Sequence, residues 1–297
     1  MAKRSKEKKR RRRLGDRSDG RKLRSLPPIM RVGCCIMSKR TGCSNRMRDR
    51  FDVGRVEQYV REKKNAGMKN FTTMHVILAA YVRVISQMPA VNRFIAGHKI
   101  FARNDIQIAL TIKKEMTLES PDTVIKFTPD ASMTAEEIYY ALQEEIEKYK
   151  EAKDGGVDKA VKILNYIPGI FLRGAIGLIR GLDYMGLLPR ALTNISPFHC
   201  SMYITSMGSL GIPPVHHHLY DFGNCPVFLA FGAKQRRYEL NEKGEVEKKE
   251  YVEYTVNLDE RICDGFYFAA ALKKMRRIFR DPWQLDTPPE TVVEDVD

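Results

Sequence analysis

Apolar residues recur along the chain with two spacings, which predict a mixture of helices and strands. Residues 72–88 are largely apolar and stop at Pro89, which predicts a buried helix. Residues 106–112 carry isoleucine or leucine at every second position, which predicts a strand. Strands are predicted at 29–38, 106–112, 200–210, 226–233, 235–240 and 249–258, and helices at 53–64, 72–88, from Thr134 onward and at 266–279. This order predicts an α/β protein with a mixed sheet and helices on one face.

Two local signals mark the ends of predicted elements. Thr134 and Glu137 have the spacing of a capping box at the start of a helix. Residues 241–244, Asn-Glu-Lys-Gly, predict a hairpin turn between the last two strands.

Residues 161–192 are strongly apolar but are interrupted by prolines, glycines and charged residues. Because no uncharged run reaches about 18 residues, the segment is not expected to cross a membrane. Two short amphipathic helices are predicted instead. They form either a packed hairpin or an apolar lid or membrane-surface patch.

The net charge of +14 is concentrated at the start of the chain. Residues 1–13 contain nine Lys or Arg and one Glu, a net charge of +8, and residues 14–25 add +2. We therefore expect a disordered basic tail at 1–25, a folded domain at 26–282 and a loose acidic tail at 283–297.

The cysteines and the short motifs exclude several classes of protein. Six cysteines lie without a repeating spacing, and Cys34, Cys35 and Cys43 lack a fourth ligand nearby, so no metal site is expected. The basic start is not followed by the apolar core of a signal peptide, which predicts a cytoplasmic protein with reduced thiols. No P-loop or dinucleotide-binding glycine motif is present.

Four stretches together are similar to one family. They are Leu258-Asp-Glu-Arg-Ile-Cys-Asp-Gly265, Ile204-Thr-Ser-Met-Gly208, Val227-Phe-Leu-Ala-Phe-Gly-Ala233 and the segment from Thr72 to Arg103 with Pro-Ala-Val-Asn92 inside it. In this order they resemble the catalytic domains of the dihydrolipoyl acyltransferases of 2-oxoacid dehydrogenase complexes and the chloramphenicol acetyltransferases. The first stretch resembles the family signature D-H-R-x-x-D-G. The likeness covers roughly residues 27–280, without a clear counterpart for 161–192.

The resemblance implies a two-layer, CoA-dependent acyltransferase fold and a homotrimer with its sites between subunits. It also implies a coenzyme A thioester as the substrate, with no metal or prosthetic group. The position of Thr205 implies a hydroxyl that steadies the oxyanion, with Ser206 beside it. Asp264 is implied to be an ion-pair partner that positions the base, and Arg261 and Gly265 to hold the geometry of the motif.

Glu260 occupies the position at which the family has its catalytic histidine. A glutamate has an ordinary pKa of about 4.3 and a thiol one of about 8.5, so proton transfer costs about 5–6 kcal/mol unless the site raises the pKa of the glutamate. Glu260 is therefore either a base with an altered pKa or a salt-bridged residue in a site that has lost this chemistry.

A run of three histidines offers a second candidate for the base. His217 or His218 could accept the proton, because imidazole titrates near neutral pH. Asp221 could orient one ring, and Asn224 closes the same polar stretch. Structural histidines and a metal site are the alternatives.

The sequence thus predicts a CoA-dependent acyltransferase with an unknown acceptor. The alternative is a catalytically inactive trimeric scaffold or ligand-binding homologue. A third interpretation assigns the main role to the basic tail, which would contact polyanions such as nucleic acid or an anionic membrane.

Overall fold

The computed structural model describes residues 12–113, 122–151 and 165–297. Its main sheet has the strand order β2-β9-β8-β7-β5-β6. These strands are β2 (Ser44–Asp52), β5 (Ile108–Lys113), β6 (Asp122–Phe127), β7 (Met202–Ser206), β8 (Val227–Leu240) and β9 (Val246–Asp259). The pairs β5–β7 and β7–β8 are parallel and the others antiparallel, so the predicted mixed sheet is confirmed.

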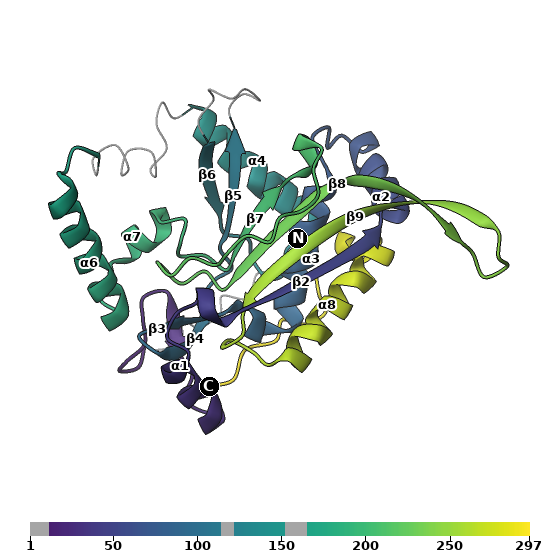
Figure 1. The fold of residues 1–297 in the computed structure, drawn as a ribbon. Helices are drawn as coiled ribbons and strands as arrows, with labels where there is room; N and C mark the ends of the chain where they lie inside the picture. Colours follow the sequence, from purple (N-terminus) through teal and green to yellow (C-terminus); the bar gives the residue numbers. More distant parts are fainter. Residues whose placement is uncertain (1–11, 114–121, 152–164) are drawn as a thin grey trace.

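A layer of helices covers one face of this sheet (Figure 1). It contains α2 (Gly54–Asn65), α3 (Thr73–Gln87), α4 (Ala135–Glu151) and α8 (Gly265–Arg280), with α3 in contact with the other three. The buried faces of these helices and of the sheet form one large apolar core. The predicted two-layer arrangement is therefore confirmed.

Two predicted helix starts are confirmed by their hydrogen bonds. The Thr134 hydroxyl accepts from the backbone of Glu137, and the Glu137 carboxylate accepts from the backbone of Thr134. At the start of α3, the ring of His75 takes the place of the glutamate, and its Nδ1 accepts from the backbone N–H of Thr72 at 3.0 Å. Burial lowers the pKa of His75 to about 4.

Part of the predicted basic tail belongs to the fold, so the expectation of disorder is wrong for residues 12–25. β1 (Gly20–Lys22) pairs with β4 (Lys99–Arg103), which pairs with β3 (Arg93–Ala96). A Cβ at Gly20 would lie 2.5 Å from the ring of Phe94, so only glycine fits this approach. The basic side chains pair with carboxylates both nearby, as in Arg17–Asp19 at 2.8 Å, and far along the chain, as in Arg21–Asp297 at 3.2 Å. Residues 1–11 lie outside the described part of the chain.

The acidic end is also packed, contrary to the expectation of a loose tail. A short helical turn (Pro282–Asp286) follows α8. Asp295 then forms two bonds to Arg93, at 2.7 and 2.6 Å, and the side chains of both residues are less than a tenth exposed. Val293 also donates its N–H to the carbonyl of Ser86. The end of the chain is therefore held to the fold, in part through the buried pair of Asp295 with Arg93.

Two elements near the start of the fold were predicted wrongly. Residues 29–38 were expected to be a strand, but α1 (Pro28–Ile36) is a helix that begins with proline at its first position. A short apolar run fits both periodicities, and the proline start favours the helix. No strand was predicted at β2, whose stretch is rich in arginine; it is an edge strand with mostly exposed or half-buried side chains.

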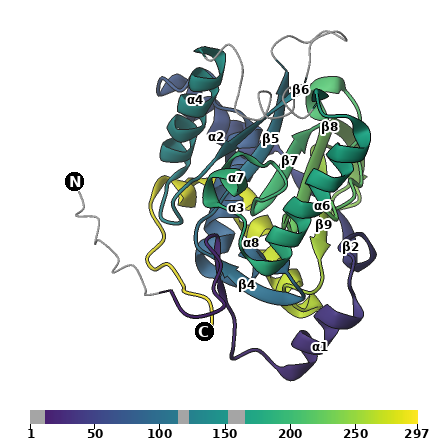
Figure 2. The same cartoon turned by 90° about the vertical axis from the view of Figure 1, so that its left-hand side faces the viewer.

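The segment 161–192 contains the two helices that were predicted, apart from residues 161–164, which lie outside the description. They are α6 (Gly169–Met185) and α7 (Arg190–Ile195). Figure 2 shows α6 on the opposite side of the molecule from α4. Among the described residues, no helix is long and apolar enough to cross a membrane.

Candidate functional site

The family-like motif at the end of β9 is organised around a buried carboxylate. Asp259 is completely buried and accepts two bonds from Arg261, at 2.8 and 2.7 Å. Arg40 approaches the same carboxylate at 3.3 Å. Arg261 also donates to the carbonyl of Met37 at 2.7 Å. The motif therefore fixes the segment after α1 against the end of β9.

Glu260 stands directly between Asp259 and Arg261. Its backbone N–H donates to the carbonyl of Cys43 at 2.9 Å, and its side chain is partly exposed. Within the described parts of the chain, its carboxylate has no hydrogen-bond or ion-pair partner. The described residues therefore give no support to the interpretation of Glu260 as a salt-bridged residue.

Asp264 has a different role from the one the resemblance implied. It is the N-cap of α8, and its carboxylate accepts from the backbone N–H of Tyr267 at 2.8 Å. Gly265 is the first residue of that helix. The ion pair that holds the motif is made by Asp259 instead, because Asp264 is exposed at the helix start.

Thr205 and Ser206 end β7 and are half-buried. They pair with Ala230 and Phe231 of β8, and Ala230 in turn pairs with Thr255 of β9. Glu260 lies five residues beyond Thr255, and Thr205 lies two strands away. With about 3.3 Å per residue and about 4.8 Å per strand, Thr205 and Glu260 are on the order of 15–20 Å apart within one chain. One chain therefore does not bring them to the same substrate atom.

The histidine run packs against strands β8 and β9 of the main sheet. The ring of His217 stacks on Phe228, with centroids 3.9 Å apart and planes 4° from parallel, and the ring of His218 lies 4.7 Å from that of His217. The carbonyl of His217 accepts from the side chain of Asn257. Burial lowers the pKa of His217. These contacts make His217 a neutral, packed ring at neutral pH.

The two other polar residues of this stretch do not orient a histidine. Asp221 accepts from the backbone N–H and the hydroxyl of Thr41, each at 3.0 Å. Asn224 is buried, donates to Asp19 and accepts from Arg103, both at 2.9 Å. The predicted His–Asp pair with Asp221 is therefore wrong, since Asp221 fastens the loop to the segment after α1.

A cavity of about 440 Å³ opens beside the motif. Basic side chains on its wall are Lys39, Arg40, Arg180 and Arg261, with Asp183, Asp221 and His98 also present. Arg261 and Asp221 were among the predicted site residues, whereas the contribution of α6 was not predicted. The cavity therefore joins the motif, the segment after α1 and the end of α6.

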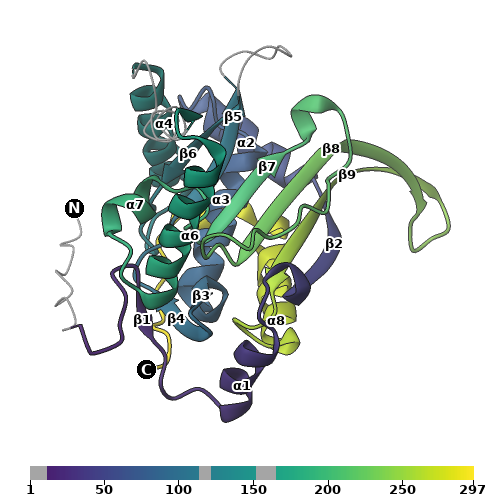
Figure 3. The same cartoon turned by 60° about the vertical axis from the view of Figure 1, so that its left-hand side comes forward.

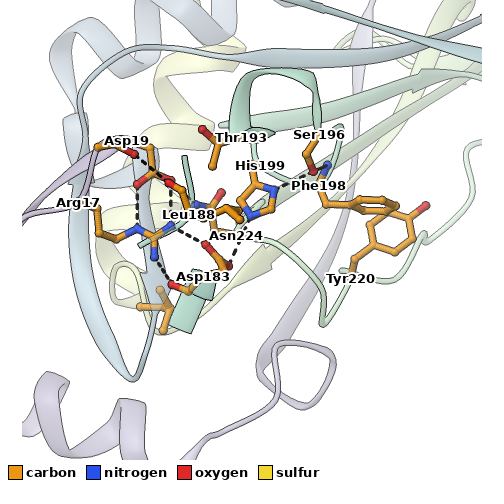
Figure 4. A network of polar contacts seen from close by, with 12 residues as sticks. Arg17, Asp19, Asp183, Leu188, Thr193, Ser196, Phe198, His199, Tyr220 and Asn224 are labelled. Atoms are coloured by element: carbon orange, nitrogen blue, oxygen red, sulfur yellow. Dashed lines mark hydrogen bonds and ion pairs between the residues drawn. The ribbon is translucent and has the colours of Figure 1, made fainter. Parts of the chain in front are cut away.

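A buried polar network fixes the end of α6 next to this cavity (Figure 4). Asp183 bonds to Arg17 at 2.6 Å, and His199 Nε2 lies 3.4 Å from the same carboxylate. The ring of His199 bonds to the Ser196 hydroxyl through Nδ1 at 2.7 Å. Burial opposes ionisation of Asp183, but His199 and Arg17 together lower its pKa to about 2. No sequence motif links these residues, which come from distant segments.

Comparisons with known proteins found similar solved structures but no similar sequence. No protein-family model matches the sequence, and no curated protein matches it. A solved structure of a probable dihydrolipoamide acetyltransferase from Listeria monocytogenes 4b F2365 is similar with a TM-score of 0.55 at 15% identity, covering 88% of this chain and 95% of that chain. Azotobacter vinelandii dihydrolipoamide acetyltransferase gives 0.55 at 11% identity, with 89% and 93% covered. A chloramphenicol acetyltransferase gives 0.51 at 10% identity, with 88% and 99% covered.

These identities are too low to transfer residue roles, but the coverage is nearly complete on both sides. The order of strands, the single helical layer and the position of the motif at the end of β9 agree with the resemblance seen in the sequence. The chain therefore has the CoA-dependent acyltransferase fold shared by dihydrolipoamide acetyltransferase cores and chloramphenicol acetyltransferase.

Proposed function

We propose that the protein transfers an acyl group from a coenzyme A thioester, with Glu260 as the general base. The observation that carries this proposal is the carboxylate of Glu260, which has no hydrogen-bond or ion-pair partner in residues 12–113, 122–151 and 165–297 and is held between the tightly bonded Asp259 and Arg261. A carboxylate without a partner among the described residues can take up a proton when a substrate or a neighbouring subunit removes water from it. Desolvation raises the pKa of a carboxyl group and brings it closer to that of a thiol acceptor.

The site requires a second subunit in this proposal. The estimated separation of Thr205 from Glu260 is too large for both to act on one tetrahedral intermediate. A homotrimer would place Thr205 and Ser206 of one subunit opposite Glu260 of the next. There the hydroxyls would donate to the oxyanion while the carboxylate takes the proton.

The basic wall of the cavity favours coenzyme A, whose thioesters carry phosphate groups, as the ligand. Lys39 and Arg180 are exposed at its wall, and Arg40 and Arg261 add positive charge behind them. Arginine and lysine bind phosphate oxygens through charge-assisted hydrogen bonds. Coenzyme A carries such groups, so its nucleotide end would lie at this wall.

A catalytically inactive trimeric scaffold is the second candidate. It is favoured by one observation, the glutamate at the position where the family has histidine. The same cavity would then hold a ligand without turnover.

Mass spectrometry of the native protein is the first test, and light scattering is the second. An acyl-CoA or free CoA that co-purifies would support the thioester. A mass of three times 34.2 kDa would support the trimer. A monomer at micromolar concentration would overturn the shared site. Bound thioester without any turnover across acyl chain lengths and acceptors would favour the scaffold.

A further inference from the structure

The outer side of α6 is an apolar strip. Not one residue of this helix is buried, although most of its side chains are apolar. Ile170, Phe171, Leu178 and Met185 are 77%, 68%, 65% and 62% exposed. At about 3.6 residues per turn, these four positions fall within one arc of roughly 100°. The helix therefore presents a continuous apolar face to its surroundings.

The charges of α6 are arranged around this strip. Arg173 and Arg180 lie roughly 60–80° beyond one edge of the arc and are exposed, and Arg180 also lines the cavity. Asp183 is the one acidic residue in the sequence of this helix, and it faces inward to Arg17 and His199. The outward side thus combines apolar and basic side chains without a carboxylate.

Helix α1 repeats this pattern. Ile29, Val32 and Ile36 are 73%, 52% and 76% exposed and lie within a similar arc, while Cys34 on the other side is buried. Arg31 is the one charged residue in the sequence of α1. Two helices far apart in the sequence therefore each expose an apolar face, although Arg31 lies well away from the face of α1.

Both helices border the cavity beside the motif. The segment that follows α1 contributes Ser38, Lys39 and Arg40 to its wall, and the end of α6 contributes Arg180 and Tyr184. Figure 3 shows α1 and α6 in front of the sheet in the same view, and Figure 1 places the lower, C-terminal end of α6 on the side that carries α1. The C-terminal ends of both helices thus lie near one opening.

We propose that α1 and α6 dock the protein on an anionic lipid membrane, with the cavity facing the lipid headgroups. A helix with an apolar face and basic edges lies in the plane of the interface, with its arginines at the level of the phosphates. Anionic lipids attract such arginines, and the +14 net charge of the chain acts in the same direction. A neighbouring subunit is the alternative occupant of this face, and the oligomeric mass of the variants described below distinguishes it from lipid.

The glycines of α6 are consistent with this assignment. A Cβ at Gly174, Gly177 or Gly181 would meet nothing within 4 Å, so close packing within the chain does not require them. Glycine weakens a helix in water relative to alanine. Such a helix gains order when an interface buries its apolar side.

Flotation of the full chain with vesicles tests the proposal. The vesicles contain phosphatidylcholine, with or without phosphatidylglycerol. We expect binding to the anionic vesicles and a loss of at least about tenfold in the double variant Phe171→Glu and Leu178→Glu. Ile29→Glu with Ile36→Glu should act in the same direction. Leu240→Glu with Val246→Glu is the matched control, because these residues of the β8–β9 hairpin are 70% and 71% exposed.

The outcomes separate lipid from protein contacts. Residues 1–11 are present in every variant, so their charge cannot cause a difference between variants. Equal vesicle binding by wild type and the α6 variant would overturn the proposal, and so would no binding by wild type. An α6 variant that changes the oligomeric mass but not vesicle binding would assign the face to a second copy. Melting temperatures within about 2 °C of wild type would show that the folded state is kept, since these positions are exposed.

Discussion

The guanidinium of Arg17 bonds to the carboxylate of Asp183 at 2.6 Å and joins the beginning of the described chain to the end of α6. Both side chains are largely buried, at 4% and 14% exposed. Breaking a buried pair by removing one partner leaves the other charge uncompensated, which costs about 3–5 kcal/mol. Asp19 still bonds to Arg17, so we expect Asp183→Ala to lower the free energy of unfolding by about 2–4 kcal/mol in urea titrations.

Arg13 provides the matched control for this pair. It bonds to Asp297 at 2.9 Å, but its side chain is 52% exposed. Arg13→Ala should therefore cost less than about 1 kcal/mol. Equal losses in the two variants would contradict the buried contribution of Asp183.

His75 should make the protein sensitive to mild acid. Burial lowers its pKa in the folded state to about 4. Below about pH 6.5 the unfolded chain binds a proton that the folded chain does not, so stability falls as the pH drops toward 4. The full loss from this group is about 3 kcal/mol, at 1.36 kcal/mol per pH unit.

His75→Gln isolates that contribution. Glutamine can accept from the backbone N–H of Thr72 as a capping-box residue does, and it does not titrate. Urea titrations between pH 7 and pH 4 should show a smaller loss of stability in this variant. Burial lowers the pKa of His199 as well, and this contribution is common to both proteins. Parallel pH curves would exclude His75 as a source of the acid sensitivity.

The packed acidic end should contribute to stability. Asp295 neutralises Arg93, which also bonds to the carbonyl of Ile262. We expect Asp295→Ala to lower the free energy of unfolding by roughly 3 kcal/mol, because it leaves a buried arginine unpaired. Glu294→Ala, at the exposed neighbouring position, should change it by less than about 0.5 kcal/mol. A negligible effect at Asp295 would restore the expectation of a loose tail.

Two deletions should distinguish the contribution of residues 1–11 to polyanion binding from the contribution of residues 12–25 to stability. Residues 1–11 contain seven Lys or Arg, so removal of residues 2–11 should weaken binding to heparin or nucleic acid and flatten its salt dependence. Removal of residues 2–25 should in addition lower the melting temperature, because it deletes β1 and buried Arg17. Equal melting temperatures for the two deletions would contradict the structural role of residues 12–25.

Substitution of the proposed base should affect turnover and not folding. Glu260→Gln keeps the size of the side chain but cannot accept a proton, so thiol release from acyl-CoA should fall by roughly 10²–10⁴-fold. Glu144→Gln, at an exposed position of α4, is the control. If His217→Ala or His218→Ala shows that loss and Glu260→Gln does not, the base lies in the histidine run. Full activity in all three variants would exclude these residues.

The elements predicted correctly are those whose signals are local. Helix α3 follows from its apolar run and Pro89, and α4 from the Thr134 and Glu137 pair. The hairpin follows from Asn241 to Gly244, where the glycine has a φ of 79°. Strand β2 was missed because an edge strand does not need apolar side chains to pair. Strand β1 was missed because its basic side chains suggested a disordered tail. In the structure Arg21 of this strand pairs with Asp297, a partner far along the chain.

The candidate site was less predictable for the same reason. The motif indicated Asp259 and Arg261, but Arg40 joins them from more than 200 residues away. Asp221 was assigned to a histidine because both lie in one polar stretch, whereas its partner Thr41 comes from the segment after α1. The cavity wall formed by α6 has no signal in the sequence beyond the amphipathic pattern of that helix.

The long hairpin of β8 and β9 has a consequence for solubility. β7 pairs with β8 only from Tyr203 to Ser206, and β2 pairs with β9 only from Tyr251 onward. Among the described strands, the outer halves of the hairpin therefore have free edges, which are templates for pairing with another chain. Their sequences, Lys-Gln-Arg-Arg-Tyr-Glu at 234–239 and Glu-Lys-Lys-Glu at 247–250, place charges along both edges. Charged side chains on an edge strand oppose edge-to-edge pairing with another sheet, so the projecting arm carries its own protection against aggregation.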